Sequence, residues 1–163
     1  MRAGPDKPTF LNAPQWAVDV FRHAGFDAEL APVERTLGLL WGSVAVRCGL
    51  EALSAVLQLP YGELVQRPDT LTLMDRAATE CAMVAWARHL SLPFSDPMFA
   101  VHHAAELAPQ QEAPMRRDLR RGTPTEVDAL NGAVAQAGFQ AGVHTTVNEI
   151  LWRQVRALAG RTR

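Results

Sequence analysis

The longest apolar pattern in the sequence covers residues 37–57, where LGLLWGSVAVRCGLEALSAVL contains no proline. Apolar side chains fall on nearly every side of a helical projection, which is typical of a central, buried helix. Its polar residues Ser43, Arg47 and Glu51 are four apart and form one narrow stripe. The stripe faces a cleft, a ligand or a second subunit, or it is a solvent-facing groove with an Arg47–Glu51 ion pair.

Shorter periodic segments flank this helix on both sides. The central helix is predicted to start near Val33 and to end before Pro60. Apolar residues at helical spacing predict further helices over residues 12–24, 68–90, 96–107, 115–121, 123–142 and 146–160. Residues 61–67 are predicted as a turn, and residues 26–30 as a short extended piece. The result is an all-α helical bundle of about six helices with little strand, because only helix-on-helix packing buries these faces.

Local signals predict where several helices begin and end. Residues Thr123–Glu126 read as a capping box, with proline at the first helical position and Glu126 at the third, and Thr146–Glu149 repeats the pattern. Ser95 or Asp96 is predicted to cap the helix at Pro97. Gly25 is predicted to end the first helix.

Two further patterns allow a structural and a functional interpretation. Arg116, Arg117, Arg120 and Arg121 surround Asp118, which predicts either a solvated basic face or a site for an anion or carboxylate. Gly38 and Gly42 lie inside the central helix, where glycine permits close packing; they are not part of a phosphate-binding loop.

Composition excludes several classes of protein. With 163 residues and a net charge of −1, the chain suits one domain with its own core, and nothing indicates a nucleic-acid partner. The first ten residues contain no apolar run typical of a signal peptide, and Arg47 and Glu51 interrupt the best candidate for a membrane span. Cys48 and Cys81 lie in apolar helical patterns, which favours small core residues over a disulfide or metal site and a cytoplasmic location.

The usual motifs of cofactor and metal sites are missing. The sequence has no G-x-G-x-x-G after a strand, no H-E-x-x-H and no C-x-x-C. His102 and His103 are neighbours and point apart on a helix, so they cannot chelate one metal. We therefore expect this chain alone to bind neither a dinucleotide nor a metal ion.

The segment MRRDLRRGTPTEVDALNGAVAQAGFQAGVHTTVNEIL resembles the C-terminal domain of ketopantoate reductases (2-dehydropantoate 2-reductases). That family typically shows S-M-x-x-D, then G-R-x-T-E-I-D-x-[IL]-N-G, then G-[IV]-x-T-P-x-N. The matching residues are Met115, Asp118, Gly122, Thr125, Glu126, Asp128, Asn131, Gly132, Gly142, Thr145 and Asn148. The likeness extends back to about Phe10 and covers nearly the whole chain.

The resemblance implies a helical fold of the 6-phosphogluconate dehydrogenase C-terminal type. Family members are NADPH-dependent reductases of pantothenate biosynthesis, in which an N-terminal Rossmann domain holds the cofactor and the helical domain binds a small 2-oxo acid. This chain resembles the second domain alone: residues 1–11 form an extended lead-in, residues 12–163 the single helical domain, and the Rossmann domain is absent.

The resemblance fails at the residues that carry the reaction. The family's central helix reads W-x-K-x-x-x-N-x-x-x-N, and alignment on Trp41 puts Ser43, Arg47 and Glu51 at the lysine and the two asparagines. The lysine is the family's general acid, a role that a serine hydroxyl cannot take over. The only lysine of this chain is Lys7, in the lead-in. Pro114 replaces the motif serine before Met115.

Glu126 matches the family's active-site glutamate, which makes it the one candidate catalytic residue, although its place in a capping box is a sufficient structural reason for a glutamate. The candidate substrate-binding residues are Ser43, Arg47, Glu51 and Asp118. We expect Ser43, Arg47, Glu51 and Glu126 to border one concavity, with Arg47 pairing with a glutamate or gripping a carboxylate ligand.

Three functions are compatible with these residues. The chain is a divergent ketopantoate reductase-like domain that is inactive alone; or it is the substrate-binding half of an NADPH-dependent 2-oxo acid reductase, completed by a Rossmann partner chain or a longer gene product. The third is a non-catalytic module for helical dimerisation or small-acid binding. The expected partners are accordingly a second copy or a Rossmann domain, with a small carboxylate as ligand.

Overall fold

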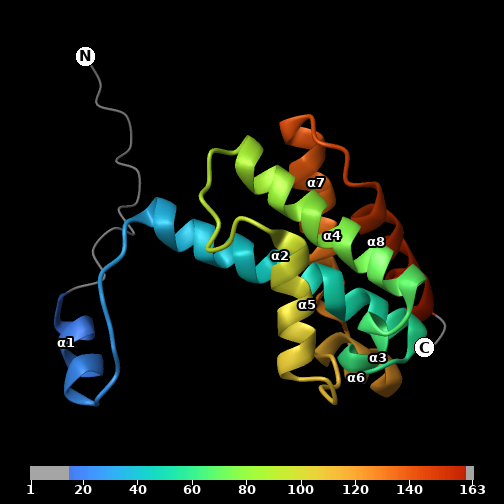
Figure 1. The fold of residues 1–163 in the computed structure, drawn as a ribbon, viewed down its shortest axis with the longest axis horizontal. Coiled ribbons are helices and arrows are strands. Elements are labelled where there is room, and N and C mark those ends of the chain that lie inside the picture. The colour runs from blue at the N-terminus through green and yellow to red at the C-terminus, as the bar shows by residue number, and fades with distance from the viewer. Residues whose placement is uncertain (1–14, 161–163) are drawn as a thin grey trace.

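The protein is all-α, as the sequence predicts (Figure 1). The structure, a computed structural model, describes residues 15–160, and this range contains eight α-helices, one short 3₁₀ helix and no strand. The elements are α1 Gln15–His23, α2 Val33–Leu57, α3 Tyr61–Val65, α4 Pro68–Ala87, α5 Pro97–Leu107, α6 Pro114–Arg121, η1 Glu126–Asp128, α7 Asn131–Ala141 and α8 Thr146–Ala159. The predicted lead-in, with Lys7, and the first residues of the helix predicted over residues 12–24 lie outside the described residues.

Helix α2 forms the centre of the bundle over its C-terminal half only. Most residues from 45 to 55 are buried, and this half is surrounded by α4, α5, α6 and α8. The prediction of a wholly buried helix is wrong for the N-terminal half, which projects from the body (Figure 1). There the side chains of Val33, Leu37, Leu39 and Leu40 are 37–57 % exposed, because no helix of the described chain covers them.

Helix α1 lies apart from the body, at the end of the projecting half of α2 (Figure 1). Only Val18 is buried in it, whereas Trp16, Val20 and Phe21 are more than half exposed. The helix ends at His23, and Gly25, the predicted stop, follows two residues later with a φ of +87°. Residues 26–31 are irregular, so the short extended piece predicted there is no strand of a described sheet.

By length and composition, α2 is the one helix among residues 15–160 that is apolar enough to cross a membrane. In this protein 56 % of that apolar stretch is buried against other helices. This burial, and the charged pair Arg47–Glu51 within the stretch, are typical of a helix in the core of a protein.

Gly38 and Gly42 let the chain after α4 cross α2 closely. A Cβ atom built on Gly38 would lie 2.0 Å from the backbone oxygen of Ser91, and one on Gly42 would lie 2.6 Å from Cδ of Pro93. Because the neighbour at Gly38 is backbone, it cannot rotate away as a side chain would. The packing role predicted for these glycines is confirmed.

Gly38→Ala is therefore expected to lower the free energy of unfolding by about 2 kcal/mol, since the added methyl overpacks a backbone crossing. Urea denaturation monitored by circular dichroism measures the loss. Gly160→Ala is the matched control, because a Cβ at Gly160 would meet its nearest neighbours at 3.6 Å or more. Equal stability of the two variants would contradict a tight crossing at Gly38.

Several predicted boundaries need correction. Residues Tyr61–Val65, predicted as a turn, form the short helix α3, and Gly62 donates a backbone hydrogen bond to Pro109 O at 2.8 Å. Helix α4 ends at Ala87, three residues early, because His89 takes a left-handed conformation with φ of 59° and Leu90 N closes the turn on Ala85 O. The cap predicted for α5 is confirmed, because the Asp96 carboxylate accepts hydrogen bonds from Met98 N and Phe99 N.

The capping box predicted at Thr123–Glu126 is wrong. The Thr123 hydroxyl donates to Asp118 O at the end of α6, and the Glu126 carboxylate binds Arg47 of α2. Only the 3₁₀ turn η1 forms at this point, and α7 begins at Asn131. Because the Glu126 carboxylate pairs with the distant Arg47, it does not accept the backbone hydrogen bond of the predicted capping box.

A carboxylate from another helix caps α8. Glu80 of α4 accepts hydrogen bonds from the backbone N–H groups of Val147 and Asn148, at 2.9 and 3.0 Å. The repeated cap predicted at Thr146–Glu149 is therefore wrong, since Thr146 already belongs to the helix and no threonine side chain caps it. The first turn of α8 is thereby fixed to α4.

Two fully buried asparagines extend this contact into the core. The Asn148 amide nitrogen donates to Ala77 O at 3.0 Å and to Glu80 Oε2 at 2.8 Å, and its oxygen accepts from Asn131 Nδ2 at 3.0 Å. Asn131 Nδ2 also donates to Cys48 O at 3.3 Å. The network joins α2, α4, α7 and α8, which fixes the position of the residues that follow Cys48 on α2.

Candidate functional site

The polar stripe of α2 extends from solvent into the core. Ser43 is exposed, the Arg47 side chain is 38 % exposed, and the Glu51 side chain is 4 % exposed. The three residues are one turn apart because each follows the last by four positions. The stripe therefore presents a hydroxyl, a guanidinium and a carboxylate at increasing depth.

Arg47 binds two carboxylates at once. Its Nε donates to Glu51 Oε1 at 2.5 Å, and its Nη2 donates to Glu126 Oε2. Glu126 comes from η1, 79 residues later in the chain, and its side chain is 60 % exposed. The tertiary structure thus brings Arg47, Glu51 and Glu126 together in one cluster, which we call the Arg47 cluster.

The other two candidate residues do not join the Arg47 cluster. Within residues 15–160, no hydrogen bond or ion pair links the side chain of Ser43 or of Asp118 to it. Asp118 lies half-buried on α6, where its backbone oxygen accepts from Thr123. Ser43 occupies the same face of α2, one turn before Arg47.

The electrostatics of the Arg47 cluster favour a permanently charged guanidinium. The hydrogen bond that Arg47 donates to Glu51 raises the pKa of Arg47 above its ordinary value, partial burial opposes this, and the hydrogen bond donated to Glu126 adds to the rise. One guanidinium facing two carboxylates leaves a formal charge of −1. Arg47 therefore binds and orients anions but releases no proton.

Glu51 carries a second, unsatisfied oxygen. Its Oε2 is buried and has no hydrogen-bond partner, while Oε1 is held by Arg47. A buried carboxylate is costly unless it is paired. Glu51 therefore depends on Arg47 for its only described ion pair.

Tyr61 is a buried tyrosine near enough to the Arg47 cluster for its charges to matter, which the sequence did not reveal. It begins α3 and is 9 % exposed. The charges of Glu51 and Arg47 both shift the pKa of its phenol. Burial, and to a smaller extent the charge of Glu51, raise the pKa of Tyr61 to about 12, and the charge of Arg47 opposes this rise. The one feature of the sequence that could have drawn attention to this residue is that Tyr61 is the only tyrosine in the chain.

The raised pKa predicts a loss of stability in alkali. Above pH 10 the unfolded chain loses the Tyr61 proton first, so the folded state binds more protons and stability falls as pH rises toward 12. At pH 11 the expected loss is about 1.4 kcal/mol, the equivalent of one pKa unit. Urea denaturation at pH 8 and pH 11 measures it, and Tyr61→Phe is the control that should remove this part of the pH dependence. A tyrosinate absorbance titration centred near pH 10 would contradict the prediction.

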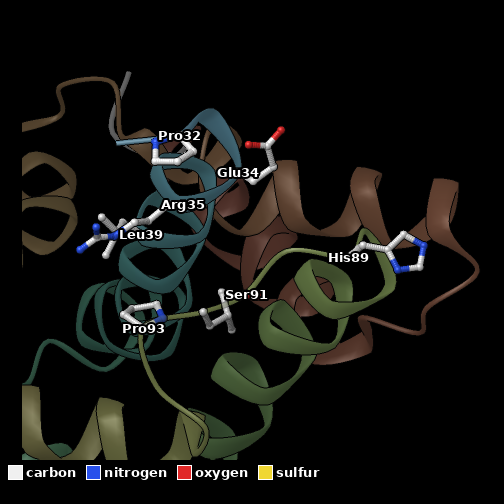
Figure 2. A pocket seen from close by; sticks show the side chains of 8 residues that line it. Pro32, Glu34, Arg35, Leu39, His89, Ser91 and Pro93 are labelled. Atoms are coloured by element: carbon white, nitrogen blue, oxygen red, sulfur yellow. The ribbon is translucent and has the colours of Figure 1, made fainter. Parts of the chain in front are cut away.

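A cavity of about 520 Å³ lies beside the N-terminal half of α2 and not at the Arg47 cluster (Figure 2). Pro32, Glu34, Arg35 and Leu39 line it from α2 and the segment before it. The opposite wall is formed by His89, Ser91, Leu92 and Pro93, which follow α4. No member of the Arg47 cluster lines this cavity.

The cysteines offer no reactive group to the site. Cys48 and Cys81 are free and buried. The hydrogen bond with Cys81, together with burial, raises the pKa of the Cys48 thiol well above its ordinary value. Residues 15–160 contain no group of three or more His, Cys, Asp or Glu side chains arranged to hold a metal ion.

Residues 36–159 match the family model described as "Ketopantoate reductase PanE/ApbA C terminal". The chain belongs to this family. The match begins three residues into α2 and covers every later helix, so the Arg47 cluster lies inside the family's domain.

Curated relatives and solved structures agree with this assignment. The 2-dehydropantoate 2-reductase of Vibrio cholerae is 30 % identical over 143 residues, which are 86 % of this chain and 46 % of that protein. That of Pyrobaculum aerophilum is 32 % identical over 117 residues, 72 % of this chain and 42 % of that protein. The PanE/ApbA family ketopantoate reductase from Ralstonia eutropha superposes with a TM-score of 0.84 at 32 % identity, covering 93 % of this chain and 50 % of that one. The chain thus spans about half the length of the relatives it matches.

More distant structures share the fold. D-mandelate dehydrogenase in complex with NADH superposes with a TM-score of 0.81 at 20 % identity, over 93 % of this chain and 51 % of that one. At that level of identity the likeness concerns the helical architecture alone.

Proposed function

We propose that this chain is the small-acid-binding half of a 2-oxo acid reductase of the 2-dehydropantoate type, and that it reduces nothing by itself. The Arg47 cluster supports the proposal: it holds a partly exposed guanidinium at a position that, by the family resemblance, corresponds to a substrate-binding residue of the central helix. A guanidinium binds a carboxylate through two parallel hydrogen bonds, so it suits the acid group of such a substrate.

The reaction would need a second domain. The chain corresponds to under half of the curated reductases that it matches, so an NADPH-binding Rossmann domain would come from a partner chain or from a longer gene product. Ser43 stands at the position of the family's lysine, and neither its hydroxyl nor Arg47 protonates an alkoxide at neutral pH. Of the four residues expected to border one concavity, Glu126, at the family's active-site glutamate, is the one that keeps the family's residue type.

The projecting part of the structure supports a partner. Large apolar side chains of α1 and of early α2, Trp16, Phe21, Leu39 and Leu40 among them, are 49–65 % exposed, and an accumulation of exposed apolar side chains is typical of an interaction surface. The backbone of residues 27–31 donates no described backbone hydrogen bond. A Rossmann domain or a second copy of the chain would cover this surface. The free, buried cysteines are compatible with the reducing conditions of a cytoplasmic protein.

A non-catalytic module is the second candidate function. The observation that favours it is the set of changed residue types at Ser43, Arg47 and Glu51, because a module that only binds acids needs no proton donor. Stable self-association of the purified chain, measured by light scattering, together with acid binding and no gain of activity from an added Rossmann domain, would distinguish it from a reductase half.

Binding measurements test the proposal directly. We expect 2-dehydropantoate to bind the purified 163-residue chain in the millimolar range, observed by NMR titration, and NADPH to show no binding below 1 mM in calorimetry, because no phosphate-cradling loop is present. Arg47→Gln should abolish binding of the acid. Binding of NADPH below 1 mM, or equal binding of the acid by Arg47→Gln, would contradict the proposal.

A further inference from the structure

The two carboxylates on Arg47 are held in unequal ways. Glu51 lies on the same helix as Arg47, is almost fully buried, and bonds Nε. Glu126 lies on a three-residue 3₁₀ turn without a side-chain cap, is largely exposed, and bonds Nη2. The first carboxylate is thus fixed inside the protein, whereas the second reaches the guanidinium from its solvent side.

Release of the two carboxylates also differs in cost. If Glu51 left Arg47, a buried charge would lose its ion pair, and its Oε2 already lacks a partner. If Glu126 left, its carboxylate would turn into water, where exposed ion pairs of this kind contribute little. Only the Glu126 side of the guanidinium exchanges partners easily.

The net charge of the Arg47 cluster determines how a carboxylic acid can bind to it. The Arg47 cluster already has two carboxylates for one guanidinium, and a third would bring the local formal charge to −2 without a new cation. Like charges at contact distance repel strongly in a partly desolvated site. A carboxylate ligand therefore binds Arg47 by replacing Glu126, not by adding to it.

Resting on the function proposed above, we infer that Glu126 occupies the position of the ligand's carboxylate on Arg47 as an internal competitor, and that a small carboxylic acid binds by exchange with it. Arg47 is then the residue that selects for a carboxylate, and Glu51 is the positioning residue that holds the guanidinium from below. The ligand class is a small monocarboxylate, such as a 2-oxo acid, whose acid group matches the carboxylate it displaces.

The exchange predicts a gain of affinity when Glu126 is removed. An internal competitor weakens the apparent affinity for the ligand, because the ligand binds only those molecules in which the competitor has left the site. For an exposed ion pair this corresponds to about a 3- to 5-fold weaker apparent Kd. Glu126→Gln keeps the size of the side chain and removes its charge, so it should bind the acid about 3- to 5-fold more tightly than the natural chain.

The experiment is an NMR titration of the full chain with 2-dehydropantoate at fixed ionic strength. Glu149→Gln is the matched control, because Glu149 is also exposed and ion-paired, with Arg153, and its loss changes the net charge equally. We expect tighter binding by Glu126→Gln only, with at most a small loss of stability in urea. Equal or weaker binding by Glu126→Gln, while the natural chain binds, overturns the internal competitor and leaves the proposed function standing. Absence of binding by both overturns the proposed function and the inference together.

Discussion

Arg47→Ala is expected to lower the free energy of unfolding by about 3 kcal/mol, because removing one partner leaves a buried charge without its counterion. Glu51 is the group left behind: its side chain is 4 % exposed, and one of its oxygens already has no partner. Glu126 adds a second carboxylate to the same position. Denaturation in urea at pH 7 measures the change.

Two companion variants isolate the cause of that loss. The double variant Arg47→Ala, Glu51→Gln should recover most of the stability, since no buried carboxylate then remains unpaired. Glu126→Gln should cost less than about 1 kcal/mol, because its side chain is 60 % exposed. A loss within about 0.5 kcal/mol for Arg47→Ala would mean that the stripe is an ordinary wet surface.

Glu80→Ala is expected to cost a similar amount, about 3 kcal/mol, since charge-assisted hydrogen bonds to buried groups are among the stronger ones. One carboxylate accepts from Val147 N, Asn148 N and Asn148 Nδ2, at distances between 2.8 and 3.0 Å. Its removal frees the first turn of α8 and leaves the buried Asn148 amide with a lost acceptor.

The matched control for this variant is Glu149→Ala, on the exposed face of α8. Among residues 15–160 its carboxylate pairs with Arg153 one turn later, and such i,i+4 pairs contribute about 0.5 kcal/mol. Thermal unfolding and hydrogen exchange of the α8 amides measure both variants. Equal losses from Glu80→Ala and Glu149→Ala would show that the tertiary cap contributes nothing beyond an ordinary surface pair.

Local rules predicted the helices whose signals lie within one turn of chain. Asp96 caps α5 because an aspartate before proline finds the N–H groups of its own helix within reach. Gly25 ends α1 because its φ of +87° suits glycine. The start of α2 at Val33 and the end of α5 at Leu107 follow from the same local signals.

Local rules failed where a distant group was available. Thr123–Glu126 has every feature of a capping box, yet Glu126 binds Arg47, because a charged partner on α2 stabilises the carboxylate more than a backbone N–H does. Likewise Glu80 of α4 caps α8 in place of a threonine. In both cases a charged side chain far away in sequence was decisive, Arg47 in the first and Glu80 in the second, and helical periodicity carries no information about such distances.

The sequence by itself determined the fold class, the family and the polar stripe of α2, since four-residue spacing places Ser43, Arg47 and Glu51 on one face in any helix. Only the tertiary structure decided that Glu126 completes a cluster with Arg47 and Glu51, and that the charges of Arg47 and Glu51 shift the pKa of Tyr61. It also decided that the N-terminal half of α2, apolar like the C-terminal half, stays half-exposed. The physical reason is that burial depends on which elements pack against a helix, and this is a property of the assembled chain.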